Sequence, residues 1–123
     1  MNWNGQERRR FPRANFPCKI VISSPPQVGA PPQELVSHTD NIGEGGIRVI
    51  LEKRLSYSDT VGLDLYLSKD KPIKCKGRVI WSREKMNPLE GQPIMFDTGI
   101  EFTTISDSDR EYIAKMVDAI LSS

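Results

Sequence analysis

The sequence is poor in the residues from which catalytic and metal sites are usually built. It has one histidine and two cysteines in 123 residues, with no CxxC pair and no Cys/His cluster at zinc spacing. A catalytic histidine needs partners, and His38 has no nucleophile motif such as GxSxG to accompany it. We therefore expect no metal, no cofactor and no enzymatic activity.

The chain also lacks a long hydrophobic run and a large net charge. No apolar stretch approaches the roughly 20 residues of a membrane span, and residues 1–5 lack the apolar segment of a secretory signal. The net charge is +1, whereas general nucleic-acid binders usually carry a basic face. These absences predict one cytoplasmic domain that neither inserts into a membrane nor binds a nucleic-acid polymer. Without a secretory signal, Cys18 and Cys75 are expected to be buried, reduced thiols.

Positive charge is instead concentrated near the N-terminus, where residues 7–13 read ERRRFPR. Pro12 restricts the residue before it to extended conformations, so we do not expect a helix through Arg13. In an extended chain Arg9 and Arg13 share one face, about 13 Å apart. Two guanidinium groups so placed could hold a ligand with phosphates or guanine edges at both ends. The alternative is a solvated basic tail.

A second distinctive segment has three glycines within four residues. Gly43, Gly45 and Gly46 follow Asn41 and lie between two strand-like runs. This density of glycine indicates a backbone that needs positive φ or approaches another group closely. Asn41 could bond a guanine edge or its own backbone, and the sequence leaves both roles open.

Six segments alternate apolar and polar residues with the period of a half-buried strand. They are residues 16–23, 33–40, 46–52, 60–67, 73–81 and 94–103. Short connections without interleaved helices predict an antiparallel meander that closes into a six-stranded antiparallel β-barrel. The alternation places Ile94 and the aromatics Phe16, Trp81, Phe96 and Phe102 inward, and inward aromatics argue against base stacking on the sheet.

The last segment has capping residues from Ser106 onward and apolar residues at helical spacing, which predicts an amphipathic C-terminal helix packed on the barrel. The expected fold class is therefore all-β with a C-terminal helix. Residues 1–15 are expected to form a flexible arginine arm, and residues 16–123 the barrel with its helix.

The arginine pair and the glycine turn together resemble the PilZ domain, the bacterial receptor for cyclic di-GMP. The family signature is RxxxR in an N-terminal arm, matched by Arg9 and Arg13. A second motif, (D/N)xSxxG, follows the second strand and is matched at Asn41 and Gly46, whereas Gly43 stands where the family has serine. Residues 77–81 and 98–102 resemble the late strands of the family.

The resemblance implies a cyclic di-GMP effector without catalytic activity. Its ligand-binding residues would be Arg8, Arg9, Arg13, Asn41, Gly43, Gly45 and Gly46. Ligand binding would order the arm and alter the surface offered to an unidentified downstream protein. In the family an arginine at the position of Arg8 goes with two stacked ligands, which implies two cyclic di-GMP molecules per protomer. The alternative is a PilZ-fold interaction adaptor with weak or no nucleotide binding.

The glycine in place of the motif serine leaves two outcomes open for Gly43→Ser. If the backbone accepts a side chain, serine would add a hydrogen bond and raise affinity. If Gly43 has positive φ, serine would strain the turn and lower both stability and affinity.

Overall fold

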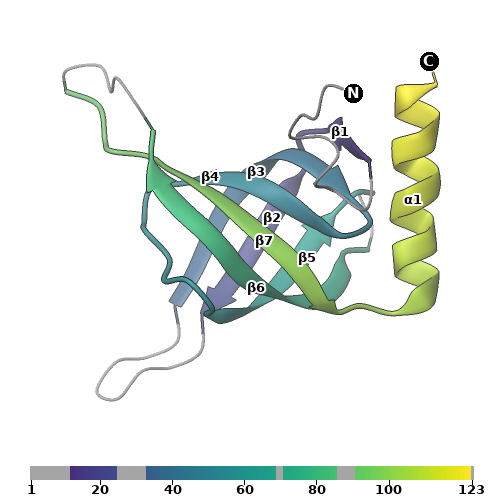
Figure 1. Ribbon diagram of the computed structural model, residues 1–123, viewed down its shortest axis with the longest axis horizontal. Coiled ribbons are helices and arrows are strands. Elements are labelled where there is room, and N and C mark those ends of the chain that lie inside the picture. Colours follow the sequence, from purple (N-terminus) through teal and green to yellow (C-terminus); the bar gives the residue numbers. More distant parts are fainter. Residues whose placement is uncertain (1–11, 25–32, 69–70, 86–90, 123) are drawn as a thin grey trace, which may run out of the picture.

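The computed structural model describes residues 12–24, 33–68, 71–85 and 91–122 (Figure 1). The strands are β1 (Arg13–Asn15), β2 (Lys19–Ser24), β3 (Gln33–Gly43), β4 (Gly46–Leu51), β5 (Thr60–Tyr66), β6 (Ile73–Glu84) and β7 (Phe96–Thr104). One helix, α1 (Asp107–Leu121), follows the last strand. No helix in the described part of the chain is long and apolar enough to cross a bilayer.

The strands form a closed barrel in the order β3-β2-β5-β6-β7-β4, because β4 also pairs with β3. All of these pairings are antiparallel, so the predicted six-stranded antiparallel β-barrel with a C-terminal helix is confirmed. The short strand β1 is an addition to the prediction. It comprises the last three residues of the expected arm, and it pairs with β3.

The expected meander is wrong at one connection. After β4 the chain does not continue to an adjacent strand, because β5 pairs with β2 and β6 on the other side of the barrel. The crossing segment, residues 52–59, buries Leu55 and is tied to β6 through Val79. The Val79 carbonyl accepts from the Ser58 N–H at 2.8 Å, and the Val79 N–H donates to the Asp59 carbonyl at 2.9 Å.

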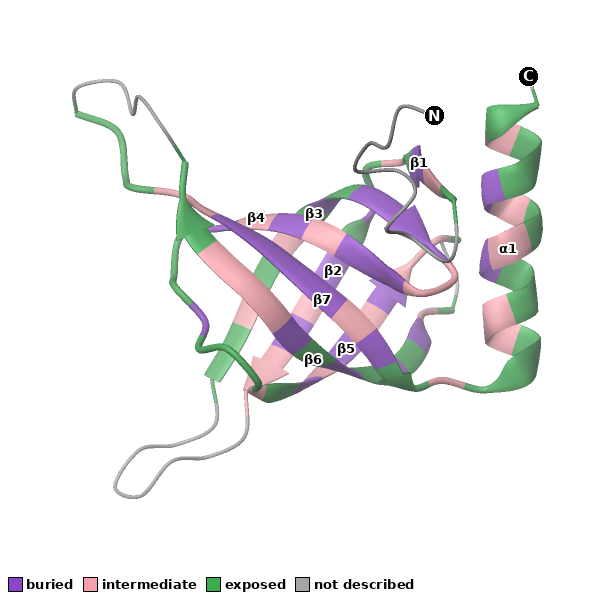
Figure 2. Cartoon of the chain, viewed as in Figure 1, coloured by how far each residue is buried: buried purple, intermediate pink, exposed green. Residues whose placement is uncertain are grey.

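The core fills the inside of the barrel and continues under α1 (Figure 2). Its largest fully buried side chains come from every barrel strand and from the helix: Ile20, Ile22, Ile42, Ile47, Val49, Val61, Leu63, Leu65, Val79, Ile100, Ile113 and Val117. α1 contacts β1 and β3 at one end of the barrel. Ser106 caps the helix as predicted, since its hydroxyl accepts from the Asp109 N–H at 3.1 Å.

Two inward placements from the sequence are wrong. Ile94 is 50% exposed because β7 begins two residues later, at Phe96. A register shift between Val79 and Trp81 reverses the alternation of β6 at that point, so that Trp81 lies opposite Gly99. Gly99 lies between the fully buried Thr98 and Ile100 and therefore faces outward, and the indole occupies the space where a Gly99 side chain would stand. Trp81 thus lies on the outer face of the barrel.

The two cysteines are buried and free, as expected. Cys75 pairs with Leu63, which pairs with Ile22, whereas Cys18 lies four residues before Ile22 on the chain. The thiols are therefore separated both across the sheet and along it. Burial raises the pKa of the Cys75 thiol to about 12 and also raises the pKa of the Cys18 thiol.

Candidate functional site

Strand β1 brings Arg13, the second arginine of the motif, onto the glycine hairpin. In the pairing of β1 with β3, Arg13 lies opposite Gly43 and Asn15 lies opposite Asn41. Between them Ala14 is buried and anchors this short strand to the core. Two segments that are 26 or more residues apart in the sequence therefore meet. Arg8 and Arg9 lie outside the described residues.

The glycines at both ends of the β3–β4 hairpin are required by close backbone approaches. A Cβ on Gly43 would lie 2.5 Å from the Pro12 carbonyl oxygen, and a Cβ on Gly46 would lie 2.3 Å from the Ile100 carbonyl oxygen. Neither residue has positive φ. Gly45, at the hairpin tip, accepts from the Phe102 N–H at 2.9 Å, which ties the tip to β7. Of the two reasons the sequence offers for these glycines, close approach is confirmed at Gly43 and Gly46.

Asn41 is 8% exposed, and its side-chain oxygen is buried without a hydrogen-bond partner among the described residues. The alternative in which this oxygen bonds the local backbone therefore has no support in the structure. Leaving a buried acceptor unsatisfied costs about 1–3 kcal/mol. An oxygen of this kind, beside an arginine-bearing strand, is suited to accept from a donor such as a guanine N–H.

Sequence reasoning missed Arg48, which lies opposite Asn41 on β4. Its guanidinium group donates to both carboxylate oxygens of Asp97, from Nε at 2.7 Å and from Nη2 at 2.6 Å. Asp40 lies 3.1 Å from Nη1. The hydrogen bonds to Asp97, together with the negative charges of Asp97 and Asp40, raise the pKa of Arg48. The available signal was a single arginine in an otherwise apolar strand directly after the glycine turn.

Arg48 belongs to a line of residues that crosses five strands on the outer face of the barrel. We call this line the outer row, and its members are Asn15, Asn41, Arg48, Gly99 and Trp81. At about 4.8 Å per strand it is roughly 19 Å long. It combines two amides, a fixed guanidinium group and an indole ring. The guanidinium carbon of Arg83 lies over this ring, 5.0 Å from its centre. These groups can bond and stack on a flat, polar ligand.

We expect Asp97→Asn to destabilise the fold by about 1–2 kcal/mol, because it removes the charge from a bidentate pair whose carboxylate is largely buried. Urea denaturation measures this difference. Asp64→Asn is the matched control, since Asp64 makes a single, more exposed contact to Lys74 at 3.3 Å, and we expect a loss below about 0.5 kcal/mol. Equal losses in the two variants would mean that Asp97 does not fix Arg48.

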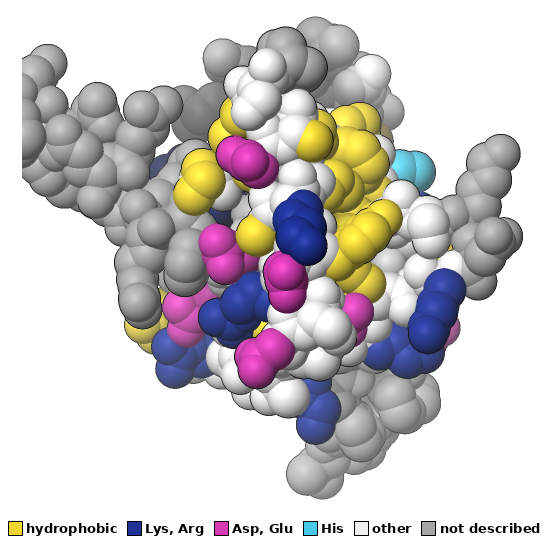
Figure 3. Space-filling model, turned by 90° about the vertical axis from the view of Figure 1, so that its right-hand side faces the viewer, with side chains coloured by type: hydrophobic (Ala, Val, Ile, Leu, Met, Phe, Trp, Pro, Cys, Tyr) yellow, Lys and Arg dark blue, Asp and Glu magenta, His cyan; other side chains and the backbone are white. Residues whose placement is uncertain are grey.

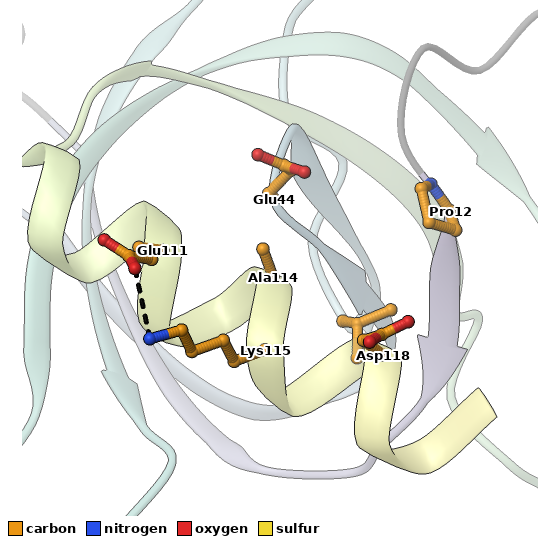
Figure 4. Close-up of a pocket in the computed structure, with 7 residues that line it drawn as sticks. Pro12, Glu44, Glu111, Ala114, Lys115 and Asp118 are labelled. Carbon is orange, nitrogen blue, oxygen red and sulfur yellow. Dashed lines mark ion pairs between the residues drawn. The ribbon is translucent and has the colours of Figure 1, made fainter. Parts of the chain in front are cut away.

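A pocket of about 330 Å³ lies between α1, the tip of the β3–β4 hairpin and the start of β1 (Figure 4). It is lined by Pro12, Glu44, Glu111, Ala114, Lys115, Val117 and Asp118. Three of these residues are acidic, and the one lysine is paired with Glu111 at 3.1 Å. An anion is therefore disfavoured in this pocket.

The fold and the site define a small closed β-barrel whose N-terminal strand carries an arginine onto a glycine hairpin. A family model described as the PilZ domain matches residues 7–119. The chain therefore belongs to the PilZ family, a family of cyclic di-GMP receptors. Comparison with curated protein sequences finds no match.

Three solved structures are similar in fold. The PilZ domain of YcgR from Escherichia coli, solved with cyclic di-GMP, has a TM-score of 0.68 at 13% identity, with coverage of 94% of this chain and 92% of that one. The Bacillus subtilis inhibitor of motility, MotI, has a TM-score of 0.66 at 20% identity and covers 91% of this chain. The MrkH–cyclic di-GMP complex from K. pneumonia has a TM-score of 0.65 at 18% identity and covers 94%. The chain spans about half the length of MotI and MrkH.

Proposed function

We propose that this protein is a receptor that binds cyclic di-GMP across the outer row, beneath its N-terminal arm. The observation that carries the proposal is the pairing of Arg13 with Gly43, which brings one residue of the arginine motif next to the glycine hairpin. The solved complexes of YcgR and MrkH with cyclic di-GMP support the choice of ligand. Binding alone accounts for this function, and it requires no reaction.

Each signature residue has a role that fits its position. Arg9 and Arg13 hold phosphates or guanine edges through bidentate hydrogen bonds. Asn41 offers its unpartnered oxygen to a guanine N–H. Gly43 and Gly46 leave room for the Pro12 and Ile100 carbonyls against the hairpin, so we place a direct approach of the ligand to the main chain at Gly45.

We place the aromatic contact at Trp81, the far end of the outer row. Stacking of a base on an aromatic side chain is worth about 1–3 kcal/mol. We expect Trp81→Ala to weaken cyclic di-GMP binding by that amount, whereas Trp81→Phe retains most of the affinity because it keeps an aromatic face. Calorimetric titration of both variants measures this, and equal losses in the two would argue against stacking.

The direct test is calorimetric titration with cyclic di-GMP, with cyclic di-AMP and GTP as controls. We expect binding of cyclic di-GMP alone, with two molecules per protomer and a decrease towards one in Arg8→Ala. The reason is that a second ligand brings further charges and guanine faces that another guanidinium group can pair with or stack on. A wild-type stoichiometry of one would refute the paired ligand, and no binding would refute the receptor.

We further propose that the ligand orders the arm and thereby changes the surface that a downstream protein meets. Ordering costs about 1–2 kcal/mol of backbone entropy per residue, which ligand contacts must offset. We expect amide exchange of residues 8–11, which precede the paired strand β1, to slow markedly at saturating cyclic di-GMP. Unchanged exchange would show that closure of the arm is not the mechanism.

One observation favours a second candidate function, that of an interaction adaptor with weak or no nucleotide binding. Gly43 lacks the serine hydroxyl of the family motif and offers a ligand only its backbone. The same titration distinguishes the two functions, because an adaptor of this kind would show no heat of binding at high ligand concentration.

A further inference from the structure

A second hollow lies at the corner where the chain passes from β1 to β2. Its volume is about 570 Å³, and we call it the corner hollow. It is lined by Phe16, Pro17, Cys18, Lys19, His38, Tyr66, Leu67 and Ser68. Lys19 is paired with His38 on β3 and with Tyr66 on β5, and its ammonium group lies 5.1 Å from the centre of the Tyr66 ring. The hollow therefore has apolar and aromatic walls with a cation at its rim.

Apolar surface is also present along one edge of α1. Helical spacing places Tyr112, Met116 and Ile120 on the edge opposite the one that carries Asp118 of the acidic pocket. Tyr112 is 49% exposed, and Met116 is only partly buried. Figure 3 shows a dense group of hydrophobic side chains beside this helix. Exposed apolar surface of this kind is typical of sites that bind another protein.

The charge at the corner hollow restricts which partner fits. The residues that line it include an exposed lysine and no carboxylate. The pocket between α1 and the start of β1 differs in charge, because three carboxylates line it. An amphipathic segment with acidic residues on its polar face complements a cationic rim beside apolar walls. A nucleic-acid backbone fits less well, because one lysine cannot neutralise a run of phosphates.

The corner hollow is mechanically connected to the outer row. Thr39 holds the corner through three hydrogen bonds to the main chain. Its hydroxyl donates to the Phe16 carbonyl at 2.7 Å and accepts from the Cys18 N–H at 3.0 Å, and its N–H donates to the Cys18 carbonyl at 2.9 Å. Asn15, the residue before Phe16, pairs with Asn41 in the outer row. A shift of β1 is therefore transmitted directly to the wall of the hollow.

We propose that the corner hollow is the docking surface for an acidic amphipathic segment of a partner protein, and that nucleotide bound at the outer row changes its affinity for that segment. The second half of this proposal rests on the proposed function. The first half does not, because it depends only on the shape and charge of the hollow.

The test uses two synthetic helical peptides of about 15–18 residues with leucines at positions i, i+3, i+4 and i+7, one with glutamates and one with lysines on the polar face. Fluorescence anisotropy measures their binding to the full chain. We expect the acidic peptide to bind and the basic peptide not to bind. Lys19→Glu should weaken binding of the acidic peptide about five- to tenfold, because charge reversal replaces attraction by repulsion. Lys76→Glu is the matched control on the exposed face of β6 and should change binding less than about twofold.

Equal binding of the two peptides, or equal effects of Lys19→Glu and Lys76→Glu, would overturn the docking surface. Concentration-dependent dimerisation abolished by Lys19→Glu would assign the hollow to a second copy of this chain and overturn the proposal as well. Repeating the titration at saturating cyclic di-GMP should change the affinity for the acidic peptide, and an unchanged value would overturn the coupling. If the acidic peptide binds but cyclic di-GMP does not, the proposed function fails and the docking surface stands. If cyclic di-GMP binds but the acidic peptide does not, the docking surface fails and the proposed function stands.

Discussion

Arg13→Ala is expected to weaken cyclic di-GMP binding by at least about 2 kcal/mol, or roughly thirtyfold. A guanidinium group can make two charge-assisted hydrogen bonds to a phosphate or to a guanine edge, each worth about 1.5–3 kcal/mol. The variant keeps the backbone of β1 and the buried Ala14, so the strand should still pair with β3. The loss is therefore expected in binding and not in folding, and calorimetric titration together with thermal denaturation separates the two.

Three further substitutions test whether the effect is specific. Arg9→Ala should match Arg13→Ala, since the two residues share one face of an extended chain. Arg10→Ala should be much milder because its side chain points to the opposite face. Arg13→Lys keeps the charge but loses the bidentate fork, so it should recover only part of the affinity. Equal losses for alanine at positions 9, 10 and 13 would mean that the arm acts as a diffuse cationic tail.

Gly43→Ser is expected to lower affinity by about 1–3 kcal/mol, although it restores the serine of the family motif. The added Cβ would lie 2.5 Å from the Pro12 carbonyl oxygen and 3.0 Å from Cγ of Arg13. The nearer of these is a backbone atom, which cannot rotate away, so β1 must move off β3. That movement separates Arg13 from the hairpin. Neither outcome left open by the sequence describes this situation, because the backbone at Gly43 has ordinary φ but no room.

The matched control is Gly62→Ser, which makes the same change on β5. A Cβ there would meet Ser23 at 3.6 Å, which is ordinary van der Waals contact, so binding and stability should be nearly unchanged. Titration and melting temperature of the two variants form the comparison. A rise in affinity for Gly43→Ser at an unchanged melting temperature would show that β1 does not approach the hairpin this closely in solution.

The elements of the fold could be predicted because their signals are local. Alternation over six or more residues marks each barrel strand, and capping with helical spacing marks α1. The connectivity could not be predicted, because the pairing of β5 with β2 depends on the crossing of residues 52–59 and not on the pattern within either strand. The position of Trp81 was missed for a related reason: a register shift inserts one residue and reverses every later prediction of side-chain direction.

The site was partly predictable. The sequence motifs led to Arg13, Asn41 and Gly43, and the structure brings these three together on β1 and β3. Strand β1 itself was not predicted, since three residues are too few to show a period. The pair of Arg48 and Asp97 was also not predicted, because its members are 49 positions apart and neither belongs to a motif that was recognised.

The shortness of β1 also bears on how the molecule behaves at high concentration. Each strand of the closed barrel has a neighbour on both sides, so among the described strands β1 is the one that pairs with a single other strand and lies at an edge. Free edges are templates on which strands of other molecules add and aggregates grow. Here the edge is three residues long and is bounded by Pro12 and Pro17, whose ring nitrogens donate no hydrogen bond. The chain can thus present an arginine on an edge strand without offering a ladder long enough to recruit a foreign strand.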